Sequence, residues 1–222
     1  KRSMIFVVIA LLPCLLFGIY NTGYQSNLLY GANTSIFNNI WAGLLTVLPI
    51  YIVTYSVGGL CEAIFSIIRK HEINEGFLVT GMLIPLCMPP DIPLWMVGIA
   101  TAFGIVIGKE IFGGTGFNVF NPALVARAFL FFSYPTKMSG DKVWVAQGSG
   151  VDVISQATPL ADLANNIPIN EVNHSWFDMF IGFIPGSIGE TSTLCILIGA
   201  LFLIITGIGS WRTMFGVFVG MI

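Results

Sequence analysis

Residues 76–108 read "GFLVTGMLIPLCMPPDIPLWMVGIATAFGIVIG", and this stretch decides the fold class. Its first apolar segment reaches only from Gly76 to Pro89, with one break at Pro85 and another at the "PPDIP" that follows. Its second segment, Leu94 to Gly108, is expected to span a bilayer, and its small residues favour close helix contact. A broken helix at membrane depth is tolerated only where protein or a water-filled cavity covers the freed backbone groups. The stretch therefore predicts a re-entrant or discontinuous helix within a membrane helix bundle.

Composition indicates that the whole chain is built for lipid. The 222 residues are 55% hydrophobic and 9% charged, whereas a soluble domain usually carries about 25% charged residues. Mean hydropathy is +0.86. We therefore expect an all-α integral membrane protein that crosses the bilayer several times and has membrane lipid around it. The net charge of −2 gives no electrostatic reason to expect nucleic acid as a partner.

Five further apolar runs are expected to form helices. They are the spans Ser3–Tyr20 and Trp41–Ile68, the helix Pro122–Tyr134 with Asn121 as its cap, the short broken piece Met179–Ile188, and the span Thr191–Ile208. An uncharged loop, residues 21–39, is expected between the first two. Basic residues favour the cytoplasmic side. Because "KR" precedes the first span and "RKH" follows the second, both basic clusters fall on one side, and the chain is expected to start inside.

The sequence divides into three expected parts. Residues 1–134 hold the membrane helices of a first half, residues 135–178 a polar loop outside the membrane, and residues 179–222 the start of a second membrane half. The polar part carries two lysines against five acids, which favours the non-cytoplasmic side. A faint repeat supports two halves, since Ile84–Pro85 recurs as Ile184–Pro185. Both ends look cut, so we expect a piece of a longer membrane protein.

Four ionisable residues lie in or beside apolar segments: Glu62, Lys109, Glu110 and Arg127. Such groups usually face a bundle interior or water. Lys109 and Arg127 lie near segment ends, so they either face inward or extend to the membrane surface. Glu62 is expected to face inward, and together with Glu110 it is a candidate for an ion path because carboxylate oxygens are hard ligands.

Two polar stretches could carry chemistry. In "KEIFGGTGFNVFNP", residues 109–122, three glycines permit backbone shapes barred to other residues and allow close approach of a planar ligand or a helix; they are Gly113, Gly114 and Gly116. The stretch lacks the Gly-Lys-Ser/Thr ending of a P-loop. In "DVISQATPLADL", residues 152–163, Thr158 is expected to cap a helix whose first position is Pro159 and whose first turn holds Asp162.

The cysteines and histidines give no sign of a metal site. The cysteines lie far apart in apolar surroundings and are interpreted as packing residues: Cys14, Cys61, Cys87 and Cys195. His71 and His174 are also far apart. We therefore expect no metal site built by this chain alone.

Two segments carry a family resemblance. "GKEIFGGTGFNVFNPALVARAFLFFSYPTKMSGD" followed by "DVISQATPLA" resembles the B subunits of sodium-translocating NADH:quinone oxidoreductases, and the similarity runs from about Ile19 to the end of the chain. In that family a threonine in a D-x-x-S/T-G-A-T signature carries FMN through a phosphoester bond made by a separate flavin transferase. The matching residues here are Asp152, Ser155, Ala157 and Thr158, and Gln156 stands where the family has glycine.

The resemblance implies a function as well as an attachment site. It implies a second, non-covalent flavin (riboflavin), reduction of ubiquinone, transfer of sodium ions, association with other subunits, and residence in the bacterial inner membrane. It also implies a fold of two repeats of discontinuous helices, similar to urea transporters. Gly113, Gly114 and Gly116 then become candidates for a flavin or quinone contact. The alternatives are a membrane component of an Rnf-type ferredoxin:NAD oxidoreductase, in which the RnfD protein shares the signature, a solute channel or transporter, and an inert scaffold.

Overall fold

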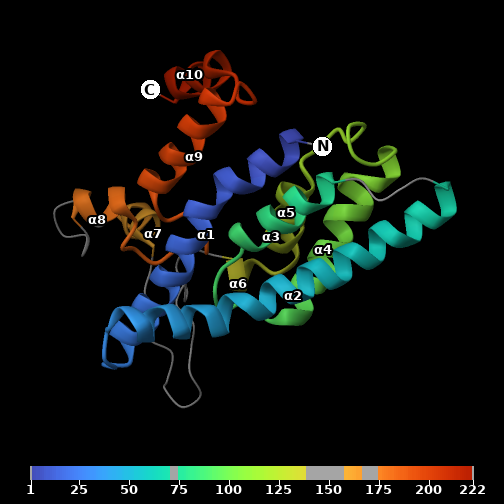
Figure 1. Ribbon diagram of the computed structural model, residues 1–222. Helices are drawn as coiled ribbons and strands as arrows, with labels where there is room; N and C mark the ends of the chain where they lie inside the picture. The colour runs from blue at the N-terminus through green and yellow to red at the C-terminus, as the bar shows by residue number, and fades with distance from the viewer. Residues whose placement is uncertain (1, 71–74, 139–157, 167–174, 222) are drawn as a thin grey trace.

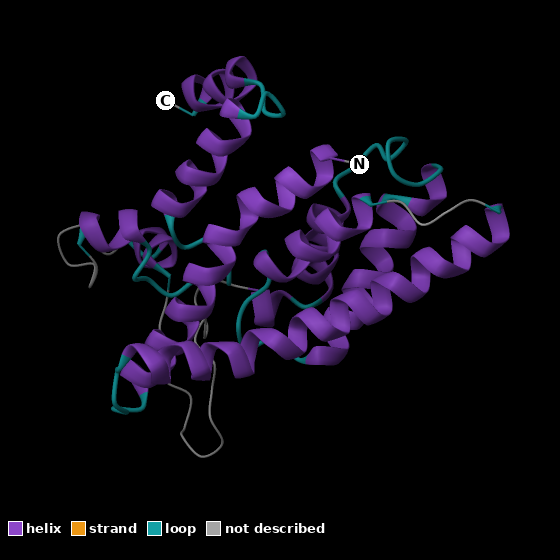
Figure 2. Cartoon of the chain, in the orientation of Figure 1, coloured by secondary structure: helices purple, strands orange, loops and turns teal. Residues whose placement is uncertain are grey.

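The computed structural model describes residues 2–70, 75–138, 158–166 and 175–221. Within these ranges the chain consists of helices joined by loops and contains no strand (Figure 2). The elements are α1 (Arg2–Leu29), α2 (Ile36–Arg69), α3 (Gly76–Leu86), α4 (Leu94–Gly108), the 3-10 helix η1 (Glu110–Phe112), α5 (Pro122–Ser133), α6 (Pro135–Met138), α7 (Pro159–Ala164), α8 (Trp176–Ile181), α9 (Thr193–Ile205) and α10 (Trp211–Gly220). The all-α prediction is confirmed.

Helices α1 and α2 form a hairpin whose two arms diverge from residues 30–35: α2 runs along one edge of the molecule, and α1 packs between α9 and α3 (Figure 1). Their 28 and 34 residues correspond to about 42 and 51 Å, at a rise of about 1.5 Å per residue. Both lengths exceed the hydrocarbon core of a bilayer, about 30 Å. Three helical segments are long and apolar enough to cross a membrane: Met4–Leu29, Ile36–Arg69 and Leu94–Phe112. A multi-span membrane helix bundle is therefore confirmed by length and composition.

The two long helices touch where small residues face each other. A Cβ atom added to Gly23 would lie 1.8 Å from the carbonyl oxygen of Asn39, and one added to Gly43 would lie 1.8 Å from that of Ile19. These distances leave no room for a side chain. The backbones can approach only because both positions are glycine, as is common where membrane helices cross.

The uncharged loop expected at residues 21–39 is wrong at both ends, because α1 continues to Leu29 and α2 begins at Ile36. Amide side chains in this region bond to partners in other elements. Asn21 Nδ2 donates to the carbonyl of Ile184 at 2.9 Å, and Asn27 Nδ2 donates to Asn39 Oδ1 at 2.7 Å. Only residues 30–35 separate the helices, and Ser35 caps α2 by accepting from the Asn38 amide.

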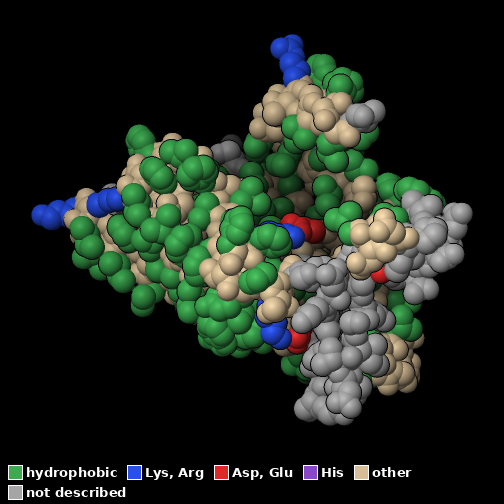
Figure 3. All heavy atoms as spheres, turned by 180° about the vertical axis from the view of Figure 1, so that it is seen from behind, with side chains coloured by type: hydrophobic (Ala, Val, Ile, Leu, Met, Phe, Trp, Pro, Cys, Tyr) green, Lys and Arg blue, Asp and Glu red, His purple; other side chains and the backbone are tan. Residues whose placement is uncertain are grey.

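Helices α3, α4 and α5 pack behind α2 and form the core with it (Figure 1). The core residues are apolar and almost fully buried; they include Val47, Ile50, Ile84, Leu86, Val97, Ala100, Ala126, Leu130 and Ile188. Large apolar side chains also cover much of the outer surface (Figure 3). Such a surface is expected of helices that face lipid.

The broken helix in residues 76–93 is confirmed. Helix α3 has 11 residues and ends at Leu86, one residue past Pro85, so it is only about 17 Å long. Residues 87–93 are not helical, and α4 follows as expected. We call residues 87–93 the first break.

The span expected at residues 191–208 is shorter than predicted. Helix α9 has 13 residues, Thr193–Ile205, which gives about 20 Å. Gly207 adopts φ +71°, a left-handed conformation that ends the helix. The amides of Ile208 and Gly209 both donate to the carbonyl of Leu203. The apolar run continues past Gly207 and gives no signal that the helix ends there. The expected span was therefore longer than α9.

A second break lies between α8 and α9, and the two breaks meet. Helix α8 begins at Trp176 and α9 at Thr193, as α3 begins at Gly76 and α4 at Leu94. Residues 182–192, which we call the second break, are not helical. The Ile188 amide donates to the carbonyl of Met88 at 3.1 Å, and the Gly189 amide donates to that of Leu86 at 2.8 Å. These bonds satisfy backbone groups that the breaks leave free.

The two-repeat architecture similar to urea transporters stays a prediction. The recurring order of a short helix, a break and a longer helix is consistent with it. The division into residues 1–134, 135–178 and 179–222 also stays a prediction, because much of its middle part lies outside the described residues.

Candidate functional site

The meeting point of the two breaks is held by polar side chains from two helices. On α5, Arg127 Nη1 donates to the carbonyl of Cys87 at 3.2 Å and lies 3.5 Å from Ser187 Oγ. The same atom forms an ion pair with Glu190. Arg127 therefore contacts both breaks, and its inward placement resolves the choice left open by the sequence. From α1, Asn21 holds the second break through the carbonyl of Ile184.

A pocket of about 530 Å³ lies beside this junction. Its lining comes from segments far apart in sequence: Arg127, Met138, Thr158, Pro159, Leu160, Leu163, Met179, Ile184, Pro185, Gly186, Ser187, Glu190 and Thr191. Among these described residues Arg127 is the one cation and Glu190 the one anion. A volume in this range, mostly apolar walls and a few polar groups are typical of small-molecule sites.

Thr158 lies where the sequence predicted a helix start. Helix α7 begins at Pro159, with Asp162 in its first turn, and the Asp162 amide donates to the Thr158 carbonyl at 3.1 Å. The side chain of Thr158 is partly buried and lines the pocket that Arg127 also lines. The other signature residues, Asp152, Ser155, Gln156 and Ala157, lie outside the described residues.

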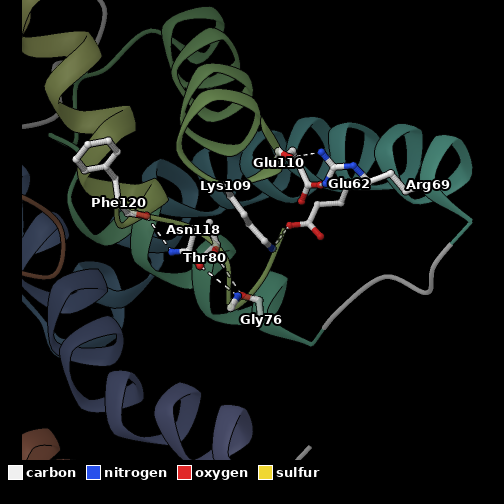
Figure 4. A network of polar contacts seen from close by, with 9 residues as sticks. Glu62, Arg69, Gly76, Thr80, Lys109, Glu110, Asn118 and Phe120 are labelled. Carbon is white, nitrogen blue, oxygen red and sulfur yellow. Dashed lines mark hydrogen bonds and ion pairs between the residues drawn. The ribbon is translucent and has the colours of Figure 1, made fainter. Parts of the chain in front are cut away.

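A second polar site lies where the C-terminal part of α2 faces the end of α4 (Figure 4). Glu62 and Lys109 form an ion pair, and both are buried, with 5% and 2% of their surface exposed. Beside them Arg69 Nη1 lies 3.5 Å from a carboxylate oxygen of Glu110, which is 2% exposed. Arg69 also donates to the Glu110 backbone carbonyl. The structure thus brings the two ion-path candidates together and gives each a cationic partner.

The glycine loop after η1 has the backbone shapes that its sequence predicts. Gly113, Gly114 and Gly116 adopt φ values of +121°, +92° and +96°, which side chains with a Cβ rarely adopt. A Cβ on Gly114 would stand 3.7 Å from both carboxylate oxygens of Glu110. Thr115 packs so closely on Gly76 that a Cβ there would lie 2.5 Å from its methyl group. The loop therefore packs directly on the start of α3 because Gly76 has no side chain, whereas a ligand contact of Gly113, Gly114 and Gly116 stays a prediction.

A smaller pocket, about 270 Å³, lies beside this loop. Its polar lining includes Thr80, Lys109, Thr115, Asn118 and Asn121. Asn118 closes the loop on itself, because its side chain accepts from the Gly116 amide and donates to the Phe120 carbonyl at 2.9 Å. The charged network of Figure 4 and this pocket share Lys109.

Sequence reasoning missed three residues of the first site: Asn21, Ser187 and Glu190. Each is a polar residue in or beside an apolar run, which is the signal that singled out Glu62. Cys87 and Cys195 are buried, as expected of packing residues. His71 and His174 lie outside the described residues.

Comparison with known proteins places the chain in a family. Residues 1–222, the entire chain, match the family described as NQR2, RnfD, RnfE. The chain belongs to the NQR2, RnfD, RnfE family. Curated relatives named as B subunits of the Na(+)-translocating NADH-quinone reductase include those of Chromohalobacter salexigens (49% identical), Ectopseudomonas mendocina (48%) and Azotobacter vinelandii (47%). In each comparison the whole of this chain is covered.

The chain spans only part of those relatives, 58% of the first and 60% of the other two. The family resemblance expected from the two quoted segments is confirmed. The NQR2, RnfD, RnfE family also includes the Rnf-type proteins that were the alternative. The three relatives named here are all B subunits of the NADH-quinone reductase by name.

Proposed function

We propose that the chain is the flavin-carrying part of the B subunit in a sodium-translocating NADH:quinone reductase, within a bacterial inner membrane. The relatives' names support the complex. One observation supports the flavin: Thr158, the residue that matches the attachment signature, lines a pocket together with an arginine from a distant helix. In this proposal FMN is covalently bound to Thr158, riboflavin is bound non-covalently among the helices, and ubiquinone is the electron acceptor.

The residues around Thr158 fit FMN. The pocket volume, about 530 Å³, falls within the range of about 300–1,000 Å³ typical of ligand sites. Leu160, Leu163, Met179 and Ile184 supply apolar walls suited to a flat ring system, and the Thr158 hydroxyl supplies the oxygen of a phosphoester. When bound, FMN supplies electron transfer, while the protein binds it, orients it and excludes water.

The chain's own part in attachment is limited. A threonine hydroxyl is a weak nucleophile without an activating base, so a separate flavin transferase is a partner during maturation. Asp152, Ser155 and Ala157 are proposed to form the sequence that the transferase recognises. The polar part, residues 135–178, is proposed to lie on the non-cytoplasmic side.

Glu62 and Glu110 are proposed to belong to the sodium path. Each carboxylate is paired with a cation, Lys109 or Arg69, so a sodium ion would have to displace an existing partner. Gly113, Gly114 and Gly116 are proposed to contact a flavin or the quinone, because their loop adjoins both this network and the smaller pocket. Other subunits of the complex oxidise NADH.

We predict that Thr158→Ala abolishes covalent flavin. The substitution removes the only oxygen through which residue 158 can form a phosphoester, whereas Thr158→Ser keeps that oxygen and should retain flavin. Thr191→Ala is the matched control, because Thr191 lines the same pocket but lies outside the signature. The measurement is the mass of the peptide Asp152–Leu163 and flavin fluorescence after denaturing electrophoresis. A Thr158→Ala protein that still carries covalent flavin contradicts the proposal.

A solute channel or transporter is the second candidate, favoured by the meeting of two breaks. Broken helices that face each other often form the substrate site of transporters. Solute flux into liposomes that contain this chain alone, without an electron donor, would support that function. The electron donor distinguishes an Rnf-type complex from the proposed one, because the Rnf-type complex would be reduced by ferredoxin and the proposed complex by NADH.

A further inference from the structure

The ion pair between Arg127 and Glu190 contributes little to the stability of the fold. Its side chains are 33% and 43% exposed, and ion pairs with such exposure contribute only about 0–1 kcal/mol. Yet the pair stands in a pocket that otherwise has mostly apolar walls. A pair that contributes so little can be exchanged for another partner at small cost.

The charges in the pocket favour such an exchange. Arg127 and Glu190 are the one cation and the one anion among the described residues that line it. A phosphoester joined to Thr158 would add a second anion. Two anions that share one cation repel each other, and the group that binds the guanidinium best keeps it. Arginine binds phosphate oxygens through two parallel N–H bonds, which makes it well suited to that group.

The geometry leaves the guanidinium able to make these bonds. An arginine has five N–H donors. Three contacts of Arg127 use Nη1, namely those with the carbonyl of Cys87, the hydroxyl of Ser187 and the carboxylate of Glu190, and the Cys87 thiol also interacts with the guanidinium. The guanidinium can therefore turn other donors toward a phosphate while its bond to the first break persists.

We propose that Arg127 is the phosphate-binding residue of the Thr158 pocket and that Glu190 is the counter-ion which the phosphate displaces. This inference rests on the proposed function, because it takes the ligand at Thr158 to be a flavin with a phosphate. Arg127 then selects FMN over riboflavin, which has the same rings but no phosphate. It also joins the phosphate to the first break through the carbonyl of Cys87.

The test measures reversible binding in the whole purified complex with Thr158→Ala, in which the covalent bond cannot form. Equilibrium dialysis with isotopically labelled FMN and riboflavin is carried out on this variant and on the parent complex, in which covalent FMN fills the Thr158 pocket while the separate riboflavin site is unchanged. The additional binding in the Thr158→Ala complex gives the two dissociation constants of the pocket. With Arg127 present, FMN should bind at least about tenfold more tightly than riboflavin, since a hydrogen bond to a charged group contributes about 1.5–3 kcal/mol and 1.4 kcal/mol is tenfold.

Substitutions of Arg127 and of Glu190 should change the affinity for FMN in opposite directions. Arg127→Gln should abolish the preference for FMN, and Arg127→Lys, which keeps the charge without the planar donors, should keep part of it. Glu190→Gln should raise the affinity for FMN and leave that for riboflavin unchanged, because a competing anion is removed. Arg212→Gln, a cation on α10 outside the pocket, should change neither constant.

A folding defect is distinguished from loss of phosphate binding by the riboflavin constant. If Arg127→Gln keeps its riboflavin affinity and loses only the FMN preference, the inference is supported. An Arg127→Gln complex that still prefers FMN, or a Glu190→Gln complex with weaker FMN binding, overturns it. The proposed function fails on a different observation, namely the absence of FMN from the peptide Asp152–Leu163 of the unmodified complex.

Discussion

At the scale of single residues, the buried pair of Glu62 and Lys109 has the clearest energetic consequence. Both side chains are almost fully buried, so neither can be solvated by water if its partner is removed. A buried pair contributes little net stability, but one half left alone is costly. The local charge balance is therefore neutral, and any cation that enters must compete with Lys109 for the Glu62 carboxylate.

We predict that Lys109→Met lowers the free energy of unfolding by about 3–5 kcal/mol, the usual cost of removing one partner of a buried ion pair. The double variant Glu62→Gln with Lys109→Met should recover much of this loss, because the buried carboxylate no longer carries a charge. Lys137→Met is the control: its pair with Asp91 spans 3.9 Å and is 48% and 29% exposed, so the loss should stay within about 1 kcal/mol. Thermal unfolding of the purified complex measures all three. A double variant as unstable as the single one would refute the explanation.

At the scale of elements, capping residues and prolines predicted where helices start and break. The features that were not predicted depend on contacts between residues far apart in the sequence. Asn121 caps α5 by accepting from the Ala123 amide at 2.9 Å, as expected, and α3 ends beside Pro85. Both features depend on neighbouring residues alone. The continuation of α1 past Asn21 depends on a carbonyl 163 positions away. The contacts of Arg127 depend on two breaks that only the folded chain brings together.

The close contact between α1 and α2 at Gly23 gives a prediction about stability. Gly23→Ala places a Cβ 1.8 Å from a carbonyl oxygen of α2, so the backbones must separate, and crowding of this kind costs about 1–3 kcal/mol. Gly216→Ala on α10 is the matched control, because a Cβ there meets nothing within 4 Å. It should leave stability unchanged or raise it by up to about 1 kcal/mol through helix propensity. Unfolding midpoints of the two variants give the comparison, and equal midpoints would contradict close packing at Gly23.

At the scale of the whole molecule, the α1–α2 hairpin explains the charge pattern. The start of α1 and the end of α2 lie at one end of the hairpin, and residues 30–35 lie at the other (Figure 1). The basic residue Arg69 and the glycine loop share the first end, because Arg69 binds Glu110. Charge alone predicted that the basic clusters before the first span and after the second lie on one side, but it did not predict that the glycine loop lies there too. The sequence could not predict that Thr158 and Arg127 line one pocket, since a long polar segment of the chain separates them.

The positive-inside rule turns this arrangement into a prediction of sidedness. A cysteine at Phe117, 73% exposed in the glycine-loop region, should react with a membrane-impermeant maleimide only from the cytoplasmic side. A cysteine at Asn33, exposed between α1 and α2, should react only from the opposite side, because α2, about 51 Å long, begins near Asn33 and ends beside the glycine loop. Right-side-out and inverted vesicles measure the two cases. The parent protein corrects for the native thiols, of which Cys14, Cys87 and Cys195 are buried. Labelling of both positions from one side would mean that α1 and α2 do not cross the membrane as a hairpin, and reversed labelling would mean that the chain starts outside.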